Sequence, residues 1–304
     1  MIKIYSIAED FVDTRLDRWI KKSICSVPQA LIEKNIRKGN IKVNNKKQKS
    51  SYKLKKNDQI KIINFNPQTN KNKAFKEKYK ATNKEISSTN ELIIEDNENF
   101  IVINKPSGIS VQSGTKSRRN IIDILGKSKY FKDSHPYTVH RIDKETTGVL
   151  IVAKNRKYAQ LFTSLFRIRK IHKSYLGIVI GRLKDKKGIL KDELEYFEGK
   201  KKISLTATTN YKVLDSNNNY SLLNLAPLTG RKHQIRRQLL MLGHPVLGDS
   251  KYRLTYDYKN KKSILMLHAY KISFFINEKK YEFQANPNTT FIKTLREKYL
   301  KNFW

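Results

Sequence analysis

The chain has 304 residues, of which 38% are hydrophobic, and this is sufficient for two folded domains with at least one buried core. It carries 63 Lys and Arg residues against 27 Asp and Glu residues, and the net charge of +36 favours a polyanionic partner, RNA or DNA, although abundant Lys, Asn and Ile also fit a coding bias. The single cysteine, Cys25, excludes an intramolecular disulfide, a thiolate metal cage and a CxxC redox pair, and no window reaches the ~18 apolar residues of a membrane span. We therefore expect no membrane partner and a location in the reducing cytoplasm.

Residues 1–63 form the first predicted domain. From Thr14 to about Ile63 the sequence indicates a helix, a turn, a second helix and a small β element. Apolar side chains recur at helical spacing in the first helix, at Leu16, Trp19, Ile20 and Ile24. Pro28 suits the first turn of a second helix, which Gly39 can end. A short strand then reaches a turn at Asn44-Asn45, and DQIKII returns as a second strand.

Basic side chains cover this first block. Nine of them lie between residues 21 and 49, at Lys21, Lys22, Lys34, Arg37, Lys38, Lys42, Lys46, Lys47 and Lys49. Such charges usually form a solvated surface, but this density favours a phosphate-binding surface. The segments TRLDRWI, VPQALIEKNIRKGNIKVNNKK and YKLKKNDQIKI resemble an S4-type RNA-binding domain. The resemblance implies a small α/β domain that binds structured RNA, and we expect contacts from Arg37, Lys38 and Lys42.

Residues 64–90 are rich in Lys and Asn and nearly free of aliphatic side chains, which predicts a polar linker. From residue 91 to residue 304, apolar runs of strand length alternate irregularly with helical stretches. The runs are FIVINK, GVLIVAK, SYLGIVIG, YSLLNLAPL and KISFFIN, and the helical stretches are YAQLFTSLFRI, GRKHQIRRQLLMLG and TTFIKTLREKYL. This pattern predicts an α+β domain with a mixed, largely antiparallel sheet flanked by helices.

Two polar segments adjoin predicted strands in this second domain. In VINKPSGISVQSG a strand runs into Lys105-Pro106 and a glycine-containing turn, which an ordinary strand end explains at least as well as a functional site does. In HRIDKETTGVLIVAKN the residues His140, Arg141 and Asp143 precede a turn into a buried strand. A charged loop on a core strand is a rigid mount for chemistry. An equally good alternative is that Asp143 only caps the turn and pairs with Arg141.

Two further segments bring polar groups to element ends. Lys173 and Tyr175 lead the strand SYLGIVIG, where a tyrosine most often packs in the core and less often stacks on a base. In PLTGRKHQIRRQLLMLG a turn at Thr229-Gly230 opens a helix. The polar residues of that helix are Arg231, His233, Gln234, Arg236 and Arg237. The alternative is an amphipathic surface helix with solvated arginines, but polar residues at a helix start favour anion binding.

Taken together, HRIDKETTGVLIVAKN, TGRKHQIRRQLLMLGHPVLGDSKY, VINKPSGISVQSG and LHAYKISF resemble the RluA-type pseudouridine synthases. With the S4-like domain ahead of them, they are most similar to the RluC-type enzymes of that family, which modify large-subunit ribosomal RNA. The resemblance implies that Asp143 is the catalytic carboxylate, that Arg141 helps to extrude the target uridine, and that Tyr175 packs on the uracil. It also implies that a basic residue of TGRKHQIR pairs with the carboxylate, and we prefer Arg231 over Arg236.

The implied reaction sets chemical requirements. Uridine isomerisation breaks the C1′–N1 bond and attaches C5 in place of N1, without redox change or metal, so no cofactor is expected. It requires an ionised carboxylate, acting as nucleophile or as base, and an arginine within ~4–6 Å favours the charged form. Only Glu145 and Asp249 offer a second acid in the four segments that could handle water. We expect His140 and Lys173 to contact the RNA together with the arginines.

Three functions remain compatible with the sequence. The first is a pseudouridine synthase that acts as a monomer on large-subunit ribosomal RNA. The second is the same chemistry on transfer RNA, and the third is a catalytically silent RNA-binding factor in ribosome assembly. The intact set of Asp143, Arg141, Tyr175 and Arg231 argues against the silent factor. The six histidines show no metal-ligand spacing, so no metal site is expected.

Overall fold

We describe a computed structural model, in which residues 2–24, 27–64, 79–113, 119–198, 201–254 and 264–302 are placed. The chain divides into two compact units, residues 1–77 and 78–304, and each is described by itself. Cys25 and most of the expected linker, residues 65–78, lie outside the described residues. Within the described ranges, no helix has both the length and the apolar character needed to cross a membrane.

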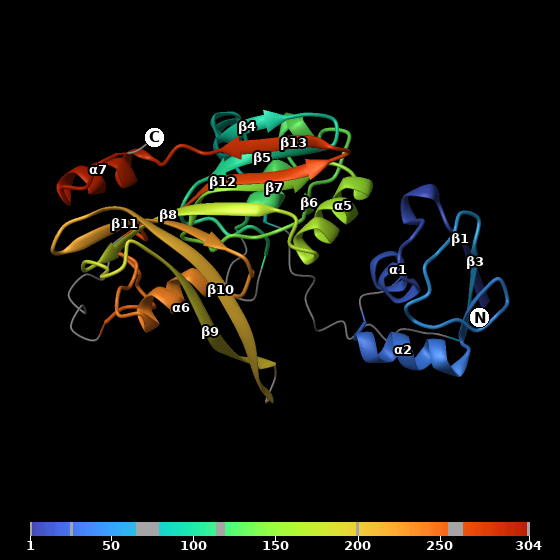
Figure 1. Ribbon diagram of the computed structural model, residues 1–304. Helices are drawn as coiled ribbons and strands as arrows, with labels where there is room; N and C mark the ends of the chain where they lie inside the picture. Colours follow the sequence, from blue (N-terminus) through green and yellow to red (C-terminus); the bar gives the residue numbers. More distant parts are fainter. Residues whose placement is uncertain are drawn as a thin grey trace. The chain divides into compact units, whose positions relative to one another are not determined.

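The N-terminal unit packs two helices against an antiparallel sheet with the strand order β1-β3-β2 (Figure 1). Its elements are β1 (Ile2–Ser6), the 3-10 helix η1 (Glu9–Phe11), α1 (Leu16–Ser23), α2 (Gln29–Lys38), β2 (Ile41–Val43) and β3 (Gln59–Ile63). The two predicted helices and the predicted strand pair are confirmed. Helix α2 ends as expected, because Gly39 adopts a left-handed φ of 81°. Strand β1, which pairs with β3, was not expected.

Residues 79–90 differ from the linker that their composition indicated, because residues 83–90 are helical. They include α3 (Asn83–Ser87) and the start of the 3-10 helix η2 (Ser88–Leu92). Thr82 caps α3 by accepting a hydrogen bond from the Glu85 amide, and the Glu85 carboxylate accepts one from the Thr82 amide. The same carboxylate accepts from the Tyr79 hydroxyl at 2.9 Å and pairs with Arg119 Nε at 2.6 Å. Two capping residues therefore order a stretch whose overall composition is polar.

The second unit is built on one sheet with the order β4-β5-β7-β12-β8-β11-β10-β9, with β13 beside β12 and β6 beside β7 (Figure 1). The strands are β4 (Ile93–Asp96), β5 (Phe100–Lys105), β6 (Tyr137–Thr138), β7 (Thr147–Ala153), β8 (His172–Ile180), β9 (Lys187–Glu198), β10 (Lys201–Ser216), β11 (Tyr220–Pro227), β12 (Leu267–Ile276) and β13 (Lys279–Gln284). Among the described strands, only β7 and β12 pair in parallel. The predicted mixed, largely antiparallel sheet is confirmed.

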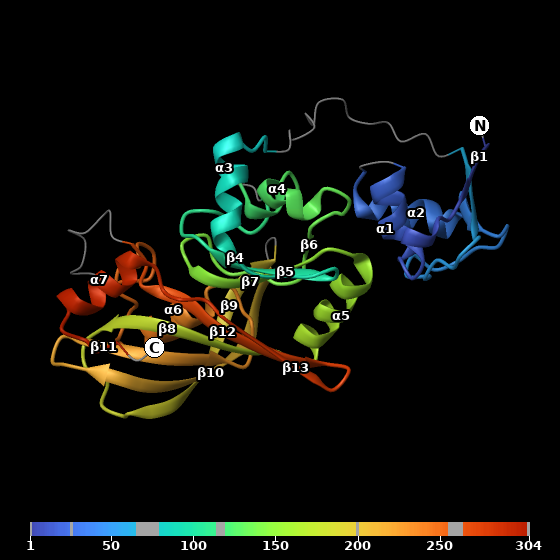
Figure 2. The same cartoon turned by 90° about the horizontal axis from the view of Figure 1, so that it is seen from above.

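Helices cover both faces of this sheet, because several of its strands are apolar on both sides. They are α4 (Ile121–Leu125), α5 (Arg156–Arg167), α6 (Gln234–Met241) and α7 (Thr289–Glu297), and a 3-10 helix η3 spans Lys129–Phe131. Alternate residues of β5 divide between the two faces: Ile101 packs in the cluster of α4, whereas Phe100 packs against Phe162 of α5. Figure 2 shows α4 and α5 on opposite sides of β5 and β7.

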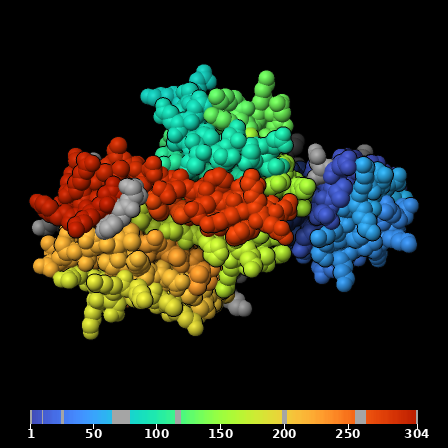
Figure 3. All heavy atoms as spheres, turned by 45° about the horizontal axis from the view of Figure 1, so that its top comes forward, coloured from blue at the N-terminus to red at the C-terminus, as the bar shows by residue number. Residues whose placement is uncertain are grey.

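The other half of the sheet repeats this arrangement. Ile235 and Leu239 of α6 pack with Leu223 of β11, whereas Leu295 of α7 packs with the neighbouring residue Leu222 on the opposite face. Strand β12 joins the two halves, because it lies between β7 and β8. In Figure 3 the orange-red residues of the β12–β13 hairpin form a strip, with teal residues on one side and yellow to yellow-green residues on the other.

The junction of β7 with β12 requires a glycine. Gly148 has a φ of 108°, and a Cβ added there would lie 2.1 Å from the carbonyl oxygen of Ala269. We expect Gly148→Ala to lower the free energy of unfolding by about 3 kcal/mol or more, because the two strands must separate. Urea unfolding followed by circular dichroism measures this loss.

The control for this prediction is Gly243→Ala. Gly243 also has a positive φ, 85°, but no atom lies within 4 Å of an added Cβ. Its substitution should therefore cost only the backbone strain, about 1–2 kcal/mol. Equal losses in the two variants would contradict the close approach of β7 and β12 as the cause.

Candidate active site

The second unit contains a cleft of about 780 Å³. Its walls come from the loop before β7, the C-terminal end of α5, the start of β8 and the turn before α6. Among the described residues that line it, Asp143 is the only carboxylate. The basic residues lining it are Arg141, Arg167, Arg169, Lys173, Arg231, Lys232 and Arg236. The cleft therefore presents one acidic group in a cationic surrounding.

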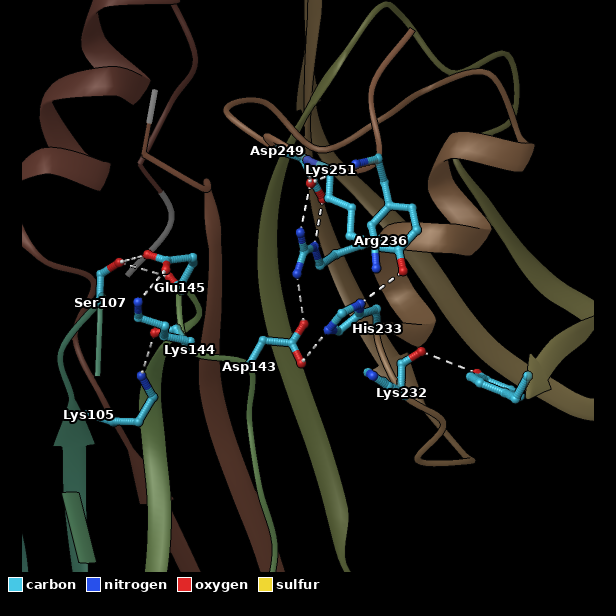
Figure 4. A network of polar contacts seen from close by, with 12 residues as sticks. Lys105, Ser107, Asp143, Lys144, Glu145, Lys232, His233, Arg236, Asp249 and Lys251 are labelled. Atoms are coloured by element: carbon cyan, nitrogen blue, oxygen red, sulfur yellow. Dashed lines mark hydrogen bonds and ion pairs between the residues drawn. The ribbon is translucent and has the colours of Figure 1, made fainter. Parts of the chain in front are cut away.

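Asp143 is held by a guanidinium group (Figure 4). Arg236 Nη1 donates to Asp143 Oδ2 at 3.1 Å. Arg236 also donates twice to Asp249, from Nε at 2.6 Å and from Nη2 at 2.7 Å. The side chain of Asp249 is fully buried, and that of Asp143 is 20% exposed. Burial lowers the pKa of Arg236, but the hydrogen bonds and charges of the two aspartates outweigh burial and raise it, so the guanidinium stays charged.

From the sequence we preferred Arg231 as the partner of Asp143, but Arg236 makes this ion pair. Arg231 Nε donates instead to the carbonyl oxygen of Thr206 at 3.3 Å. Helix α6 begins only at Gln234, so Arg231 lies in the turn before the helix, and Arg236 lies in the first helical turn. Gln234 fixes that turn, because its Oε1 accepts from the backbone amide of Arg231 at 2.9 Å.

His233 approaches Asp143 next to Arg236 (Figure 4). Its Nε2 lies 3.7 Å from Asp143 Oδ1, and its Nδ1 lies 2.9 Å from the Tyr252 hydroxyl. Burial lowers the pKa of His233, although the charge of Asp143 opposes this shift. The net effect favours the neutral ring. His233 also has a left-handed φ of 53° at the residue before α6, and the sequence had suggested no separate role for it.

Lys105 fastens the loop that carries Asp143. Its side chain is fully buried at the end of β5, and Nζ donates to the carbonyl oxygens of Pro106, Ile109 and Lys144 at 2.7, 3.0 and 3.1 Å. Figure 4 shows the contact with Lys144. Burial lowers the pKa of Lys105 to about 7, against the opposing effect of nearby carboxylates. When Lys105 is charged, these three backbone carbonyls use all three N–H donors of its ammonium group. The sequence marked the position only as a turn after a strand.

His140 fastens the same loop from the other side. Its Nε2 accepts a hydrogen bond from the Ile151 amide at 2.9 Å, and its ring stacks on Phe166 with centroids 4.7 Å apart. Burial, with a smaller effect from the charge of Lys173, lowers the pKa of His140 to about 3. The geometry describes a neutral anchor, so the predicted contact of His140 with RNA would have to use the other ring nitrogen.

The remaining residues predicted for the second domain lie in the same cleft. Tyr175 and Lys173 enter from β8, and Lys173 Nζ lies 3.5 Å from the carbonyl oxygen of Thr229. Burial and, to a smaller extent, the charge of Asp143 raise the pKa of Tyr175, so its phenol is neutral. Burial lowers the pKa of Lys173. Arg141 is exposed and lines the cleft beside Asp143.

The two other acids considered from the sequence do not line the cleft. Glu145 accepts from the Ser107 hydroxyl at 3.3 Å, and Asp249 is occupied by Arg236. Within the part of the chain that the structure describes, no group of three or more His, Cys, Asp or Glu is arranged to hold a metal ion.

The basic residues predicted for RNA contact in the N-terminal unit lie around the end of α2. Arg37 and Lys38 are exposed in its last turn, and Lys42 is half-buried on β2. Arg37 also lines a second hollow of about 470 Å³, together with Lys47 and Lys49. Both cavities are therefore bordered by cationic side chains.

Comparisons with known proteins match both units. Residues 99–241 match the family model described as RNA pseudouridylate synthase, and residues 14–60 match the S4 domain model. The chain is 35% identical, over 90% of both chains, to ribosomal large subunit pseudouridine synthase C of Buchnera aphidicola subsp. Baizongia pistaciae. It is 34% identical to the protein of the same name from Rickettsia conorii, over 79% of this chain and 82% of that protein.

A solved structure is also similar. Human RNA pseudouridylate synthase domain containing 4 aligns with a TM-score of 0.63 and 25% sequence identity. The alignment covers 71% of this chain and 96% of the human chain.

The shared guanidinium makes a prediction for stability. We expect Arg236→Gln to lower the free energy of unfolding by about 3–5 kcal/mol, because it leaves the buried Asp249 without its cation. Arg231→Gln, the matched control, should cost less than about 1 kcal/mol, since Arg231 makes no ion pair in the described part of the chain. Urea unfolding of the two variants measures both values, and a larger loss for Arg231→Gln would contradict the assignment.

Proposed function

Because the chain belongs to the RNA pseudouridylate synthase family, we propose that it isomerises specific uridines in large-subunit ribosomal RNA, with Asp143 as the catalytic carboxylate. The observation that carries the residue assignment is the ion pair between Asp143 and Arg236 in a cationic cleft. The names of the relatives support the RNA class, and the net charge of +36 supports a polyanionic substrate.

The chemistry of the cleft suits isomerisation better than hydrolysis. Glycoside hydrolases generally place two carboxylates around the bond they break, one of which handles water. Here Asp143 is the sole carboxylate among the described residues of the cleft. The freed base must be recaptured at C5 before water attacks, and the neutral ring of Tyr175 offers it a packing surface.

The role of Asp143 in the proposal is that of an ionised group. As a nucleophile it would attack C1′, and as a base it would take a proton from the sugar or the ring. In either case the C1′–N1 bond breaks, C5 bonds to C1′, the C5 proton leaves to solvent and N1 gains a proton. Both routes begin from the carboxylate, which Arg236 stabilises through a charge-assisted hydrogen bond. The reaction needs no cofactor.

Access to the target nucleotide requires that it leave its stack, at a cost of a few kcal/mol. We assign to Arg141 the offsetting role of filling the gap, because it is exposed beside Asp143. Lys173, Arg231 and Arg236 add positive charge within the cleft. In the N-terminal unit we assign RNA contacts to Arg37, Lys38 and Lys42. We also propose that the protein acts as a monomer in the cytoplasm, where ribosomal RNA is processed.

The proposal predicts that Asp143→Asn abolishes tritium release from RNA labelled at uridine C5. The amide keeps the shape of the side chain but cannot act as a carboxylate, so RNA binding should remain nearly intact. The control is Glu145→Gln, since Glu145 lies in the same loop but does not line the cleft. This control should release tritium at nearly the wild-type rate, and release by Asp143→Asn at that rate would overturn the assignment.

The RNA class is tested by competing substrates. We expect kcat/KM for tritium release to be at least about tenfold higher with a large-subunit ribosomal RNA transcript than with transfer RNA transcripts. Faster release from transfer RNA would replace the ribosomal assignment by its alternative. If wild-type protein binds both RNAs but releases no tritium from either, a silent assembly factor is the better reading.

A further inference from the structure

The tautomer of His233 follows from its two neighbours. A carboxylate can only accept hydrogen bonds, so the imidazole nitrogen that faces Asp143 Oδ1 interacts favourably only when it carries a proton. In a neutral ring the other nitrogen, Nδ1, is then an acceptor. The Tyr252 hydroxyl lies 2.9 Å from Nδ1 and can donate to it. The local geometry thus selects a ring with its proton on Nε2, directed toward Asp143.

Tyr252 is itself firmly placed. Its backbone amide and that of Lys251 donate to Asp249 Oδ1 at 2.9 and 2.8 Å. Its ring contacts the Arg236 guanidinium at 5.1 Å and meets the His233 ring edge to face, with centroids 5.5 Å apart. The segment from Asp249 to Tyr252 therefore holds both side chains that approach Asp143, Arg236 and His233.

We propose that Tyr252 is a positioning residue of the reaction, which keeps His233 as a neutral donor toward Oδ1 of Asp143. This inference rests on the proposed function, because it takes Asp143 as the reacting carboxylate. Arg236 then fixes Oδ2 at 3.1 Å, while the 3.7 Å from His233 Nε2 leaves Oδ1 free to react. The two oxygens of one carboxylate thus face different groups: Oδ2 accepts a hydrogen bond from Arg236, and Oδ1 faces Nε2 of His233 beyond hydrogen-bond distance.

Burial has the largest effect on the pKa of His233 and favours the neutral ring. Asp143, on the loop before β7, is the acidic group that acts on it and favours the charged ring. Arg236 on α6, Lys251 from the following segment and the adjacent Lys232 all disfavour it. Burial and these three cations, against the opposing charge of Asp143, therefore favour a ring that carries a single proton.

The test variant for this proposal is Tyr252→Phe, because it keeps the ring contacts with Arg236 and His233 and removes only the hydroxyl. We expect kcat for tritium release to fall about tenfold with little change in KM, as one donor interaction is lost. The acidic limb of the kcat/KM profile should move to higher pH, since a donor that favours the ionised carboxylate is weakened. Tyr220→Phe, which removes a tyrosine hydroxyl away from the cleft, should match wild type in both measurements.

Substitutions of His233 separate donation from packing. His233→Gln places an amide N–H close to the position of Nε2 and should leave the acidic limb closer to wild type than His233→Leu does. If Tyr252→Phe keeps the wild-type kcat and pH profile, or if the Gln and Leu variants shift the limb equally, the positioning role is overturned.

A measurement independent of activity tests the tautomer. Nitrogen-15 NMR of histidine-labelled full-length protein at pH 7, with His233→Gln as the assignment standard, should show His233 protonated on Nε2. Tyr252→Phe should show a mixture of both tautomers. A ring protonated on Nδ1, or on both nitrogens, in the wild type would overturn the inference. Failure of the wild type to release tritium would instead count against the proposed function, while the NMR result still decides the hydrogen bond.

Discussion

The Arg236 guanidinium, shared between a buried and a partly exposed carboxylate, organises the cleft. Asp249 takes two of its hydrogen bonds and thereby fixes the plane of the group. Asp143 is held by a single hydrogen bond, from Nη1, and keeps access to the cleft. A buried carboxylate is costly without a cation, so the same contact that orients Arg236 also makes its removal expensive. Stability and the proposed chemistry thus both depend on the side chain of Arg236.

The sheet gives this ion pair a rigid setting. One wall of the cleft is the loop before β7, which Lys105 ties to the end of β5 and His140 ties to β7 itself. The other wall carries Tyr175 on β8 and Arg236 on α6. Neither anchor is an acid or base available to a substrate, since the donors of Lys105 and the Nε2 of His140 are used by the backbone. The proposed catalytic role of Asp143 requires this kind of support, because the carboxylate must be held in one geometry.

Part of the site could be predicted from the sequence, and the rest depends on long-range contacts. The resemblance led to Asp143 and Tyr175, and the fold brings both to one cleft. The apolar runs predicted the sheet, because a buried strand is a local run of apolar residues. The sequence did not show that Arg236, and not Arg231, pairs with Asp143. That depends on where α6 begins, and Gln234 sets this start by a hydrogen bond to Thr208 of β10, a contact that no local pattern reveals. Lys105 was missed for a related reason: its partners are backbone carbonyls, and these leave no residue signature.

The position of β12 has a consequence for the timing of synthesis. This strand lies between β7 and β8, although those strands end at Ala153 and Ile180 and β12 begins only at Leu267. While the polypeptide is still being translated, the wall with the aspartate and the wall with its arginine have no strand to join them. The two walls can therefore be joined only after β12, which ends at Ile276, has been synthesised and has left the exit tunnel.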